Sequence, residues 1–231
     1  MLIWLPIPFW LVTVVLLIRA QERSPRDIRQ TWVWKPLSTL LVIAVAGLSL
    51  TVPTHDATYT AILLVGLTLS LAGDILLIPP DNARAFKAGV AAFLLAHVAY
   101  IAACVYLQTS LSVPLDPAVE IIVAVVLLAI AVVVYRSIRP GLGSLRGPVV
   151  AYMVVISAMV QRALSLAVES TDITPQLILI ALGALLFYIS DAILAINRFR
   201  FGDRLPRGRL LNLSAYYLGQ LLIALSASFY G

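Results

Sequence analysis

Two stretches decide the fold, Leu69-Ser-Leu-Ala-Gly-Asp-Ile-Leu-Leu-Ile78 and Phe187-Tyr-Ile-Ser-Asp-Ala-Ile-Leu-Ala195. Each is apolar enough to lie in a bilayer, yet each contains one aspartate, Asp74 or Asp191, with Ile-Leu close behind it. A carboxylate in hydrocarbon costs about 2.5–3.5 kcal/mol on insertion scales. Two such residues are therefore the first candidates for a functional site.

The composition is that of a membrane protein. Of 231 residues, 61% are hydrophobic and 12% are charged, and the mean hydropathy is +1.01; a soluble domain carries about 25% charged residues. The net charge of +5 comes without interleaved aromatic and basic residues, so nothing indicates nucleic-acid binding. The single cysteine, Cys104, excludes an intramolecular disulfide, and we interpret it as a small core residue.

Hydropathy predicts an all-α fold, a polytopic helical bundle that forms one transmembrane domain over residues 1–231. A bilayer needs about 20 mostly apolar residues per helix. On that basis the chain has eight expected spans: 2–19, 34–53, 57–78, 86–107, 117–136, 147–168, 175–197 and 210–229. The first has no basic region before it and no small-residue cleavage site after it, so we expect a span rather than a cleavable signal peptide.

Basic residues predict the orientation. Fifteen of the sixteen lie in or beside the odd-numbered loops: Arg19, Arg23, Arg26, Arg29, Lys35, Arg84, Lys87, Arg136, Arg139, Arg146, Arg198, Arg200, Arg204, Arg207 and Arg209. By the positive-inside rule the odd loops are cytoplasmic and both termini are not. Because the protein is compact and fourteen of its sixteen basic residues are arginine, we expect a bacterial cell (inner) membrane, with an endoplasmic reticulum membrane as the alternative.

The two aspartates have matching positions. Spans 3 and 7 run in the same direction, and each aspartate lies near the cytoplasmic end, at depths that agree to within about one helical turn. Pro36 and Pro148 occupy similar places at the start of spans 2 and 6. These matches suggest a 4+4 parallel internal repeat.

Other polar side chains in the spans could line a pocket with the aspartates. The candidates are Lys35, His97, Tyr100, Tyr152, Tyr188, Ser190, Asn212, Tyr216 and Gln220. Each also has a plainer interpretation: a lysine can snorkel to headgroups, and a histidine or a polar stripe can simply join helices by hydrogen bonds. Arg162, within span 6, either snorkels or pairs with Glu169.

The sequence excludes several chemistries. It has no zinc-type spacing of Cys and His, no Gly-x-Ser-x-Gly elbow and no Gly-rich phosphate loop, so we expect neither a metal nor a cofactor. General acid–base catalysis by paired carboxyl groups remains. In such a pair, burial keeps one carboxyl group neutral while a cation keeps the other charged. A protease dyad, a proton relay and a hydrolase that forms a cationic intermediate all use such a pair.

Several motifs resemble those of the bacterial YhhN and animal TMEM86 proteins. They are the Gly-Asp and Ser-Asp segments quoted above, Lys35-Pro-Leu37, Ala92-Phe-Leu-Leu-Ala-His97-x-x-Tyr100 and Tyr216-Tyr-x-x-Gln220-Leu-Leu. The resemblance runs from span 2 to span 8. It implies an eight-span lysoplasmalogenase, which hydrolyses the vinyl-ether bond of a lysoplasmalogen to a fatty aldehyde and a glycerophospho-alcohol. Its partners would be this lysophospholipid and membrane lipids; nothing indicates the oligomeric state.

The implied chemistry suits the residues. A vinyl ether hydrolyses when its β-carbon is protonated, and the resulting oxocarbenium ion needs an anion and a water molecule, as in glycoside hydrolysis. We therefore expect Asp74 and Asp191 to be catalytic, without assigning the acid. Three alternatives are an intramembrane aspartyl protease, disfavoured by Leu71 and by the spacing of Tyr188 from Asp191, a proton-coupled transporter, and a structural scaffold.

Overall fold

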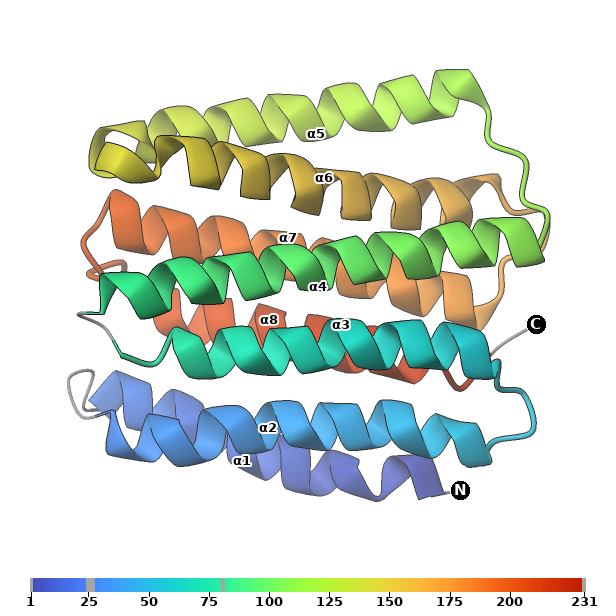
Figure 1. Ribbon diagram of the computed structural model, residues 1–231, viewed down its shortest axis with the longest axis horizontal. Coiled ribbons are helices and arrows are strands. Elements are labelled where there is room, and N and C mark those ends of the chain that lie inside the picture. The colour runs from blue at the N-terminus through green and yellow to red at the C-terminus, as the bar shows by residue number, and fades with distance from the viewer. Residues whose placement is uncertain (1, 24–27, 80–81, 230–231) are drawn as a thin grey trace.

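Eight α-helices lie side by side in one bundle (Figure 1) within residues 2–23, 28–79 and 82–229, which the computed structural model describes. Their bounds are α1 Pro6–Arg23, α2 Arg29–Leu48, α3 Ala57–Leu76, α4 Ala83–Ser110, α5 Pro117–Ile138, α6 Arg146–Glu169, α7 Pro175–Phe199 and α8 Gly208–Ser226. These residues contain no strand, so the predicted all-helical class is confirmed. Arg26 lies outside the described residues.

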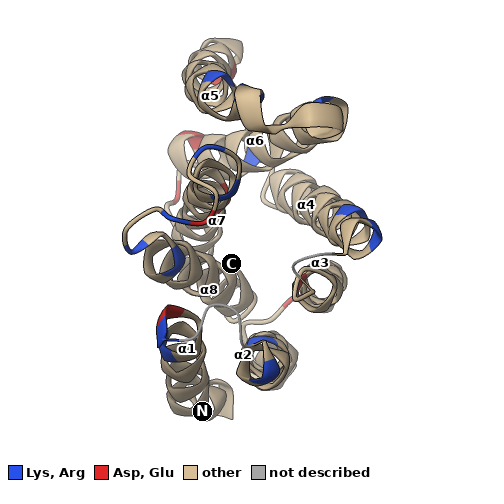
Figure 2. Cartoon of the chain, turned by 90° about the vertical axis from the view of Figure 1, so that its left-hand side faces the viewer, with Lys and Arg blue, Asp and Glu red and all other residues tan. Residues whose placement is uncertain are grey.

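Alternate connections share one end of the bundle. The connections α1–α2, α3–α4, α5–α6 and α7–α8 lie together at the end we call the basic end, and both chain termini point to the opposite end (Figure 1). Figure 2 looks onto the basic end, where the blue Lys and Arg positions gather along the chain. This is the arrangement that the alternating basic loops predict; the membrane side that this end faces stays a prediction.

Local sequence explains where several helices begin. The Asp56 side chain caps α3 by accepting a hydrogen bond from the Tyr59 N–H at 2.7 Å, and Asn82 caps α4 in the same way. Helices α5 and α7 each begin at a proline, Pro117 and Pro175, whose missing N–H would have no helical acceptor there. The polar caps therefore stand at the helix ends, and the apolar runs between them form the bundle.

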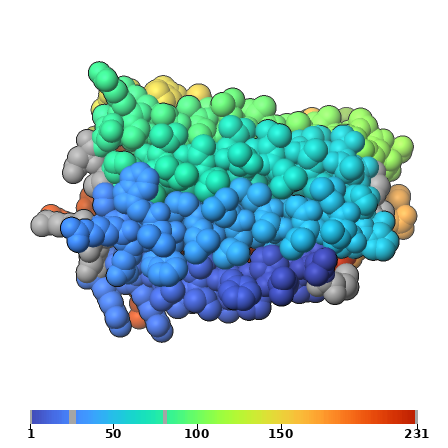
Figure 3. Space-filling view, turned by 60° about the horizontal axis from the view of Figure 1, so that its bottom comes forward, coloured from blue at the N-terminus to red at the C-terminus, as the bar shows by residue number. Residues whose placement is uncertain are grey.

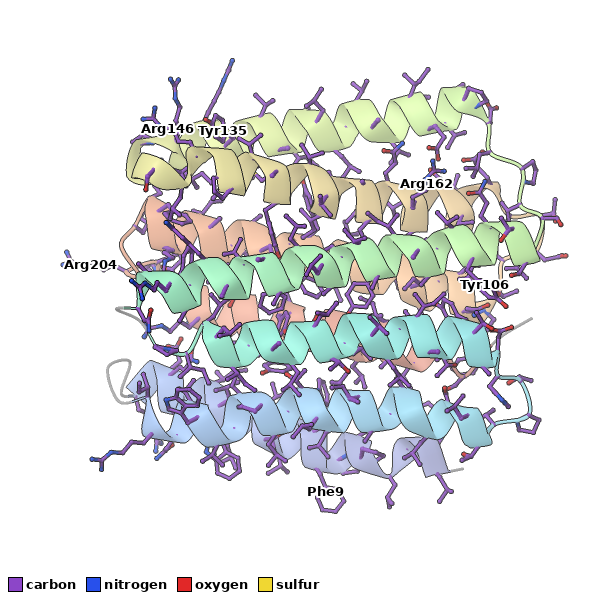
Figure 4. The ribbon with its side chains drawn as sticks, viewed as in Figure 1. Phe9, Tyr106, Tyr135, Arg146, Arg162 and Arg204 are labelled. Atoms are coloured by element: carbon purple, nitrogen blue, oxygen red, sulfur yellow. The ribbon has the colours of Figure 1, made fainter. Side chains whose placement is uncertain are left out.

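Seven of the eight helices are long and apolar enough to cross a membrane. Much of their apolar surface points outward; Phe9, for example, is 62% exposed and projects from α1 (Figure 4). Helix α5 has only two buried residues, Leu127 and Ile138. On the face seen in Figure 3, α1 to α4 form a continuous surface. Helix α8 does not meet the same hydropathy criterion because its polar residues lower the mean.

Two details differ from the sequence-based expectations. Helix α2 begins at Arg29, so Pro36 lies inside the helix, whereas Pro148 is in the first turn of α6; the two prolines are therefore not in equivalent places, and the internal repeat stays a prediction. Arg162 does not pair with Glu169. Its guanidinium lies 3.7 Å from the carboxylate of Glu120 on α5, toward the end opposite Arg146 and Arg204 in Figure 4.

Helices α7 and α8 approach each other closely through two glycines. A Cβ on Gly183 would lie 2.9 Å from the carbonyl oxygen of Gly219, and a Cβ on Gly219 would lie 2.9 Å from the carbonyl oxygen of Gly183. Small residues permit such backbone contact between membrane helices. The contact brings the polar side chains of α8 toward the middle of the bundle.

Candidate functional site

A cavity of about 300 Å³ enters the bundle from the basic end. Seven of the eleven sequence-predicted site residues line it: Lys35, Asp74, Tyr152, Tyr188, Asp191, Asn212 and Tyr216. They come from α2, α3, α6, α7 and α8. The two aspartates thus share one cavity.

Asp74 is the most tightly held group. Its side chain is 1% exposed, and its Oδ1 lies 3.2 Å from Lys35 Nζ. Its Oδ2 accepts hydrogen bonds from the hydroxyls of Thr39 at 2.5 Å and Tyr216 at 2.7 Å. Lys35 Nζ also donates to the Asp74 carbonyl oxygen at 3.2 Å. A cation and two hydroxyl donors all stabilise a charged carboxylate at this position.

Asp191 has a different environment. It is partly buried, and its Oδ2 accepts a hydrogen bond from the Tyr152 hydroxyl of α6. Among the described residues no Lys or Arg side chain lies within 4.0 Å of its carboxyl group. The two carboxyl groups of one cavity therefore have unequal surroundings, one beside a cation and one beside a hydroxyl.

Aromatic rings pack beneath and around the two carboxyl groups. The Phe187 ring lies edge-on to Phe93, Tyr216 and His97, with centroid distances of 6.1, 5.2 and 4.7 Å. Gly73 explains how Phe93 reaches this place, since a Cβ at position 73 would lie 2.6 Å from that ring. In the Gly73-Asp74 pair, the aspartate therefore supplies a carboxyl group to the cavity, and the glycine leaves room for the Phe93 ring.

Four of the predicted residues lie behind the cavity wall instead of lining it: His97, Tyr100, Ser190 and Gln220. The amide of Gln220 donates to the Tyr216 hydroxyl at 2.8 Å, and the Ser190 carbonyl oxygen accepts from Asn212 at 2.8 Å. His97 is buried, its Nδ1 2.5 Å from the Phe93 carbonyl oxygen. These residues can orient the lining groups but do not touch the cavity.

Sequence reasoning missed several groups at the site. Thr39 follows Lys35 by four residues and so shares its helix face, a signal that was present in the sequence. Arg198, Asp203 and Arg209 line the mouth at the basic end. The two arginines enter the sequence-based prediction only as loop charges, and Asp203 does not enter it. Within the described part of the chain no three metal-binding side chains gather.

Comparison with known proteins gives relatives over most of the chain. The YhhN family model matches residues 30–227. The human lysoplasmalogenase TMEM86B is 32% identical over 203 residues, 88% of this chain and 78% of that protein. Rat lysoplasmalogenase TMEM86B is 34% identical, with 73% and 62% of the two chains covered. A lysoplasmalogenase of Mycobacterium bovis is 35% identical over 61% of this chain and 51% of its own. No solved structure matches.

Proposed function

The chain belongs to the YhhN family, and from this premise we propose that it is a membrane hydrolase that cleaves the vinyl-ether bond of lysoplasmalogens. The observation that carries the proposal is the pair of aspartates in one cavity, of which only Asp74 has a cation within 4.0 Å in the described part of the chain. The products are a fatty aldehyde and a glycerophospho-alcohol. Residue roles and steps follow from the contacts within the cavity.

Asp191 is the general acid in this proposal. With no cation within 4.0 Å among the described residues, its neutral form is the less costly one in an apolar cavity. It gives its proton to the β-carbon of the vinyl ether, and the C=C electron pair forms the new C–H bond. The ether-bearing carbon becomes an oxocarbenium ion, and Asp191 becomes a carboxylate.

Asp74 is the anion that stabilises this cation. Lys35, Thr39 and Tyr216 hold it charged and fixed before the reaction begins, and preorganised charge of this kind lowers the barrier without reorganisation. Water then adds to the oxocarbenium carbon and gives its proton back to Asp191. The hemiacetal collapses, so that one water has been consumed per aldehyde and alcohol formed.

The cavity walls suit an amphiphile. Toward α5 and α6 the lining is apolar, with Ile138, Val149, Met153 and Ile156, whereas the mouth is charged. A volume of about 300 Å³ is near the lower end for small-molecule sites. We therefore place the glycerol and vinyl-ether atoms inside, with the hydrocarbon chain along the α5–α6 wall.

The test follows aldehyde release from lysoplasmalogen by detergent-purified protein. Asp74→Asn and Asp191→Asn are each expected to lose at least a hundredfold in kcat, as when a preorganised catalytic group is removed, while still showing the cooperative unfolding transition of a folded protein. The matched control is Asp172→Asn, an exposed aspartate in the α6–α7 connection at the opposite end. Full turnover by a folded variant at either position would remove that residue from the mechanism.

The same assay separates hydrolysis from transport. A proton-coupled transporter would move a solute through proteoliposomes without forming aldehyde, so the absence of product from every lysoplasmalogen tested would reject the hydrolase and leave transport to be measured.

A further inference from the structure

We propose that the mouth of the cavity is a binding site for a zwitterionic phospho-alcohol headgroup, with Arg198 and Arg209 binding the phosphate and Asp203 binding the ammonium end. This rests on the proposed function and adds the residues that recognise the headgroup of its substrate. The three side chains line the same cavity from the end of α7, the α7–α8 connection and the start of α8. The two cationic side chains at this opening are complementary to the negative phosphate of such a headgroup, and the one anionic side chain is complementary to its positive ammonium group.

The two arginines keep most of their hydrogen-bonding capacity. Arg198 lies over the Phe86 ring, with its Cζ 4.2 Å from the ring centroid, and Arg209 donates one hydrogen bond to the Gln21 carbonyl oxygen at 3.1 Å. Among the described residues neither has a carboxylate within 4.0 Å. A guanidinium has five N–H donors and binds phosphate oxygens in pairs, so both side chains are positioned but not neutralised.

The connection that carries Asp203 is held in place by one buried residue, Asn197, which is 4% exposed. Its main-chain carbonyl oxygen accepts from the Asp203 N–H at 2.9 Å, and its side-chain oxygen accepts from the Leu205 N–H at 2.9 Å. Its amide nitrogen donates to Asp203 Oδ1 at 3.5 Å. Asp203 itself has a φ of +63°, a left-handed conformation that aspartate tolerates.

These contacts make the mouth a preformed site rather than a set of free surface charges. The side chain of Asn197 fixes the turn, the turn fixes Asp203, and the Phe86 ring and the end of α1 fix the two arginines. Ordering is therefore largely complete before a ligand arrives, which lowers the entropic cost of binding. In this proposal the headgroup stays at the opening, while the vinyl ether reaches the aspartates deeper in the bundle.

The experiment compares three substrates with the same alkenyl chain: the ethanolamine lysoplasmalogen, its analogue that ends in a phosphate monoester, and the phosphate-free 1-alkenylglycerol. Arg198→Gln combined with Arg209→Gln is expected to raise KM about tenfold or more for both phosphate-containing substrates, because charge-assisted hydrogen bonds are lost. KM for the alkenylglycerol and kcat for all three should stay near wild type.

Asp203→Asn isolates the ammonium end. It is expected to raise KM several-fold for the ethanolamine substrate, and to leave or lower KM for the phosphate monoester, which has no cation to bind. Arg204→Gln is the matched control, because Arg204 belongs to the same connection but points away from the bundle (Figure 4) and does not line the cavity.

Two further measurements keep the outcomes distinct. Glycerophosphoethanolamine should inhibit the wild-type protein competitively and the double variant at least tenfold less well, a readout that needs no change in turnover. If the double variant does not fold, the two single substitutions are measured in its place. Equal KM shifts for all three substrates would overturn the headgroup site alone, whereas a wild-type protein that cleaves none of them would overturn the hydrolase itself.

Discussion

Replacing Lys35 with methionine tests the charge pair at the centre of the site. Methionine keeps much of the length and apolar character of the lysine stem but removes the ammonium. The Asp74 carboxylate, 1% exposed, would keep its hydrogen bonds from the two hydroxyls and lose its only cation within 4.0 Å among the described residues. We expect both the stability of the protein and the catalytic rate to fall.

The magnitude follows from the geometry. Two unit charges 3.2 Å apart attract each other by about 5 kcal/mol at an effective dielectric constant of about 20. Part of this offsets the cost of burying the charges, and removal of one partner from a buried pair typically costs about 3–5 kcal/mol. We therefore expect Lys35→Met to lower the free energy of unfolding by about 3 kcal/mol, and kcat to fall by about a hundredfold through the disturbed anion.

The assay is a double-mutant cycle with Asp74→Asn. Unfolding in detergent and aldehyde release are measured for both single variants and the double variant. Because the double variant has no unpaired buried charge, it should regain at least half of the stability lost in Lys35→Met while remaining inactive. Lys87, the other lysine and an exposed one, gives the control Lys87→Met. Additive stability losses, or wild-type kcat in Lys35→Met, would refute the pairing and leave Lys35 as a headgroup anchor.

Three further predictions concern other parts of the bundle. Tyr152→Phe should lower kcat about ten- to a hundredfold, because Tyr152 donates to the carboxylate that Asp191 becomes as it gives up its proton, and a hydrogen bond to a charged group contributes about 1.5–3 kcal/mol. Tyr135→Phe, at the same end (Figure 4), should leave kcat unchanged, and aldehyde release measures both variants. Gly183→Ala should destabilise the protein by about 1–3 kcal/mol through overpacking against α8, whereas Gly47→Ala, with open space around its added Cβ, should not, as unfolding midpoints in detergent will show. Arg204→Cys should react with an impermeant maleimide in inside-out vesicles only. The native Cys104 is 1% exposed, so it should contribute little background labelling. Labelling in right-side-out vesicles instead would reverse the expected orientation.

Some of this architecture follows directly from the order of residues. Because basic residues mark every second connection, spans 3 and 7 had to run in parallel, and their aspartates had to lie toward the same end. The depth of a residue in a membrane helix is set mainly by its distance from the helix ends, which hydropathy and capping residues such as Asp56 and Thr174 define. Sequence alone therefore predicted that Asp74 and Asp191 could meet.

The rotation of each helix was harder to predict. Membrane helices are apolar on all sides, so hydropathy does not identify the face that packs inward. His97 and Tyr100 do share a face, as their spacing indicates, but this face packs against aromatic rings behind the cavity. The arginines at the mouth depend on how α7 and α8 cross, which their glycines determine in three dimensions. Helix rotation and the position of these arginines therefore depend on contacts between helices, which the sequence of a single span does not reveal.

The polar stripe of α8 has a consequence for how the protein is made. This helix follows the other seven in the chain, and among the described helices it is the one too polar to be drawn into lipid by hydropathy alone. Its entry depends on partners that the earlier helices already offer: the glycine surface of α7, the carboxylate of Asp74 for Tyr216, and the Lys35 carbonyl oxygen for Tyr217 at 3.0 Å. Packing of α8 and completion of the candidate site therefore become a single event, and a chain that stops before α8 would hold both aspartates but lack the Tyr216 hydroxyl that donates to Asp74.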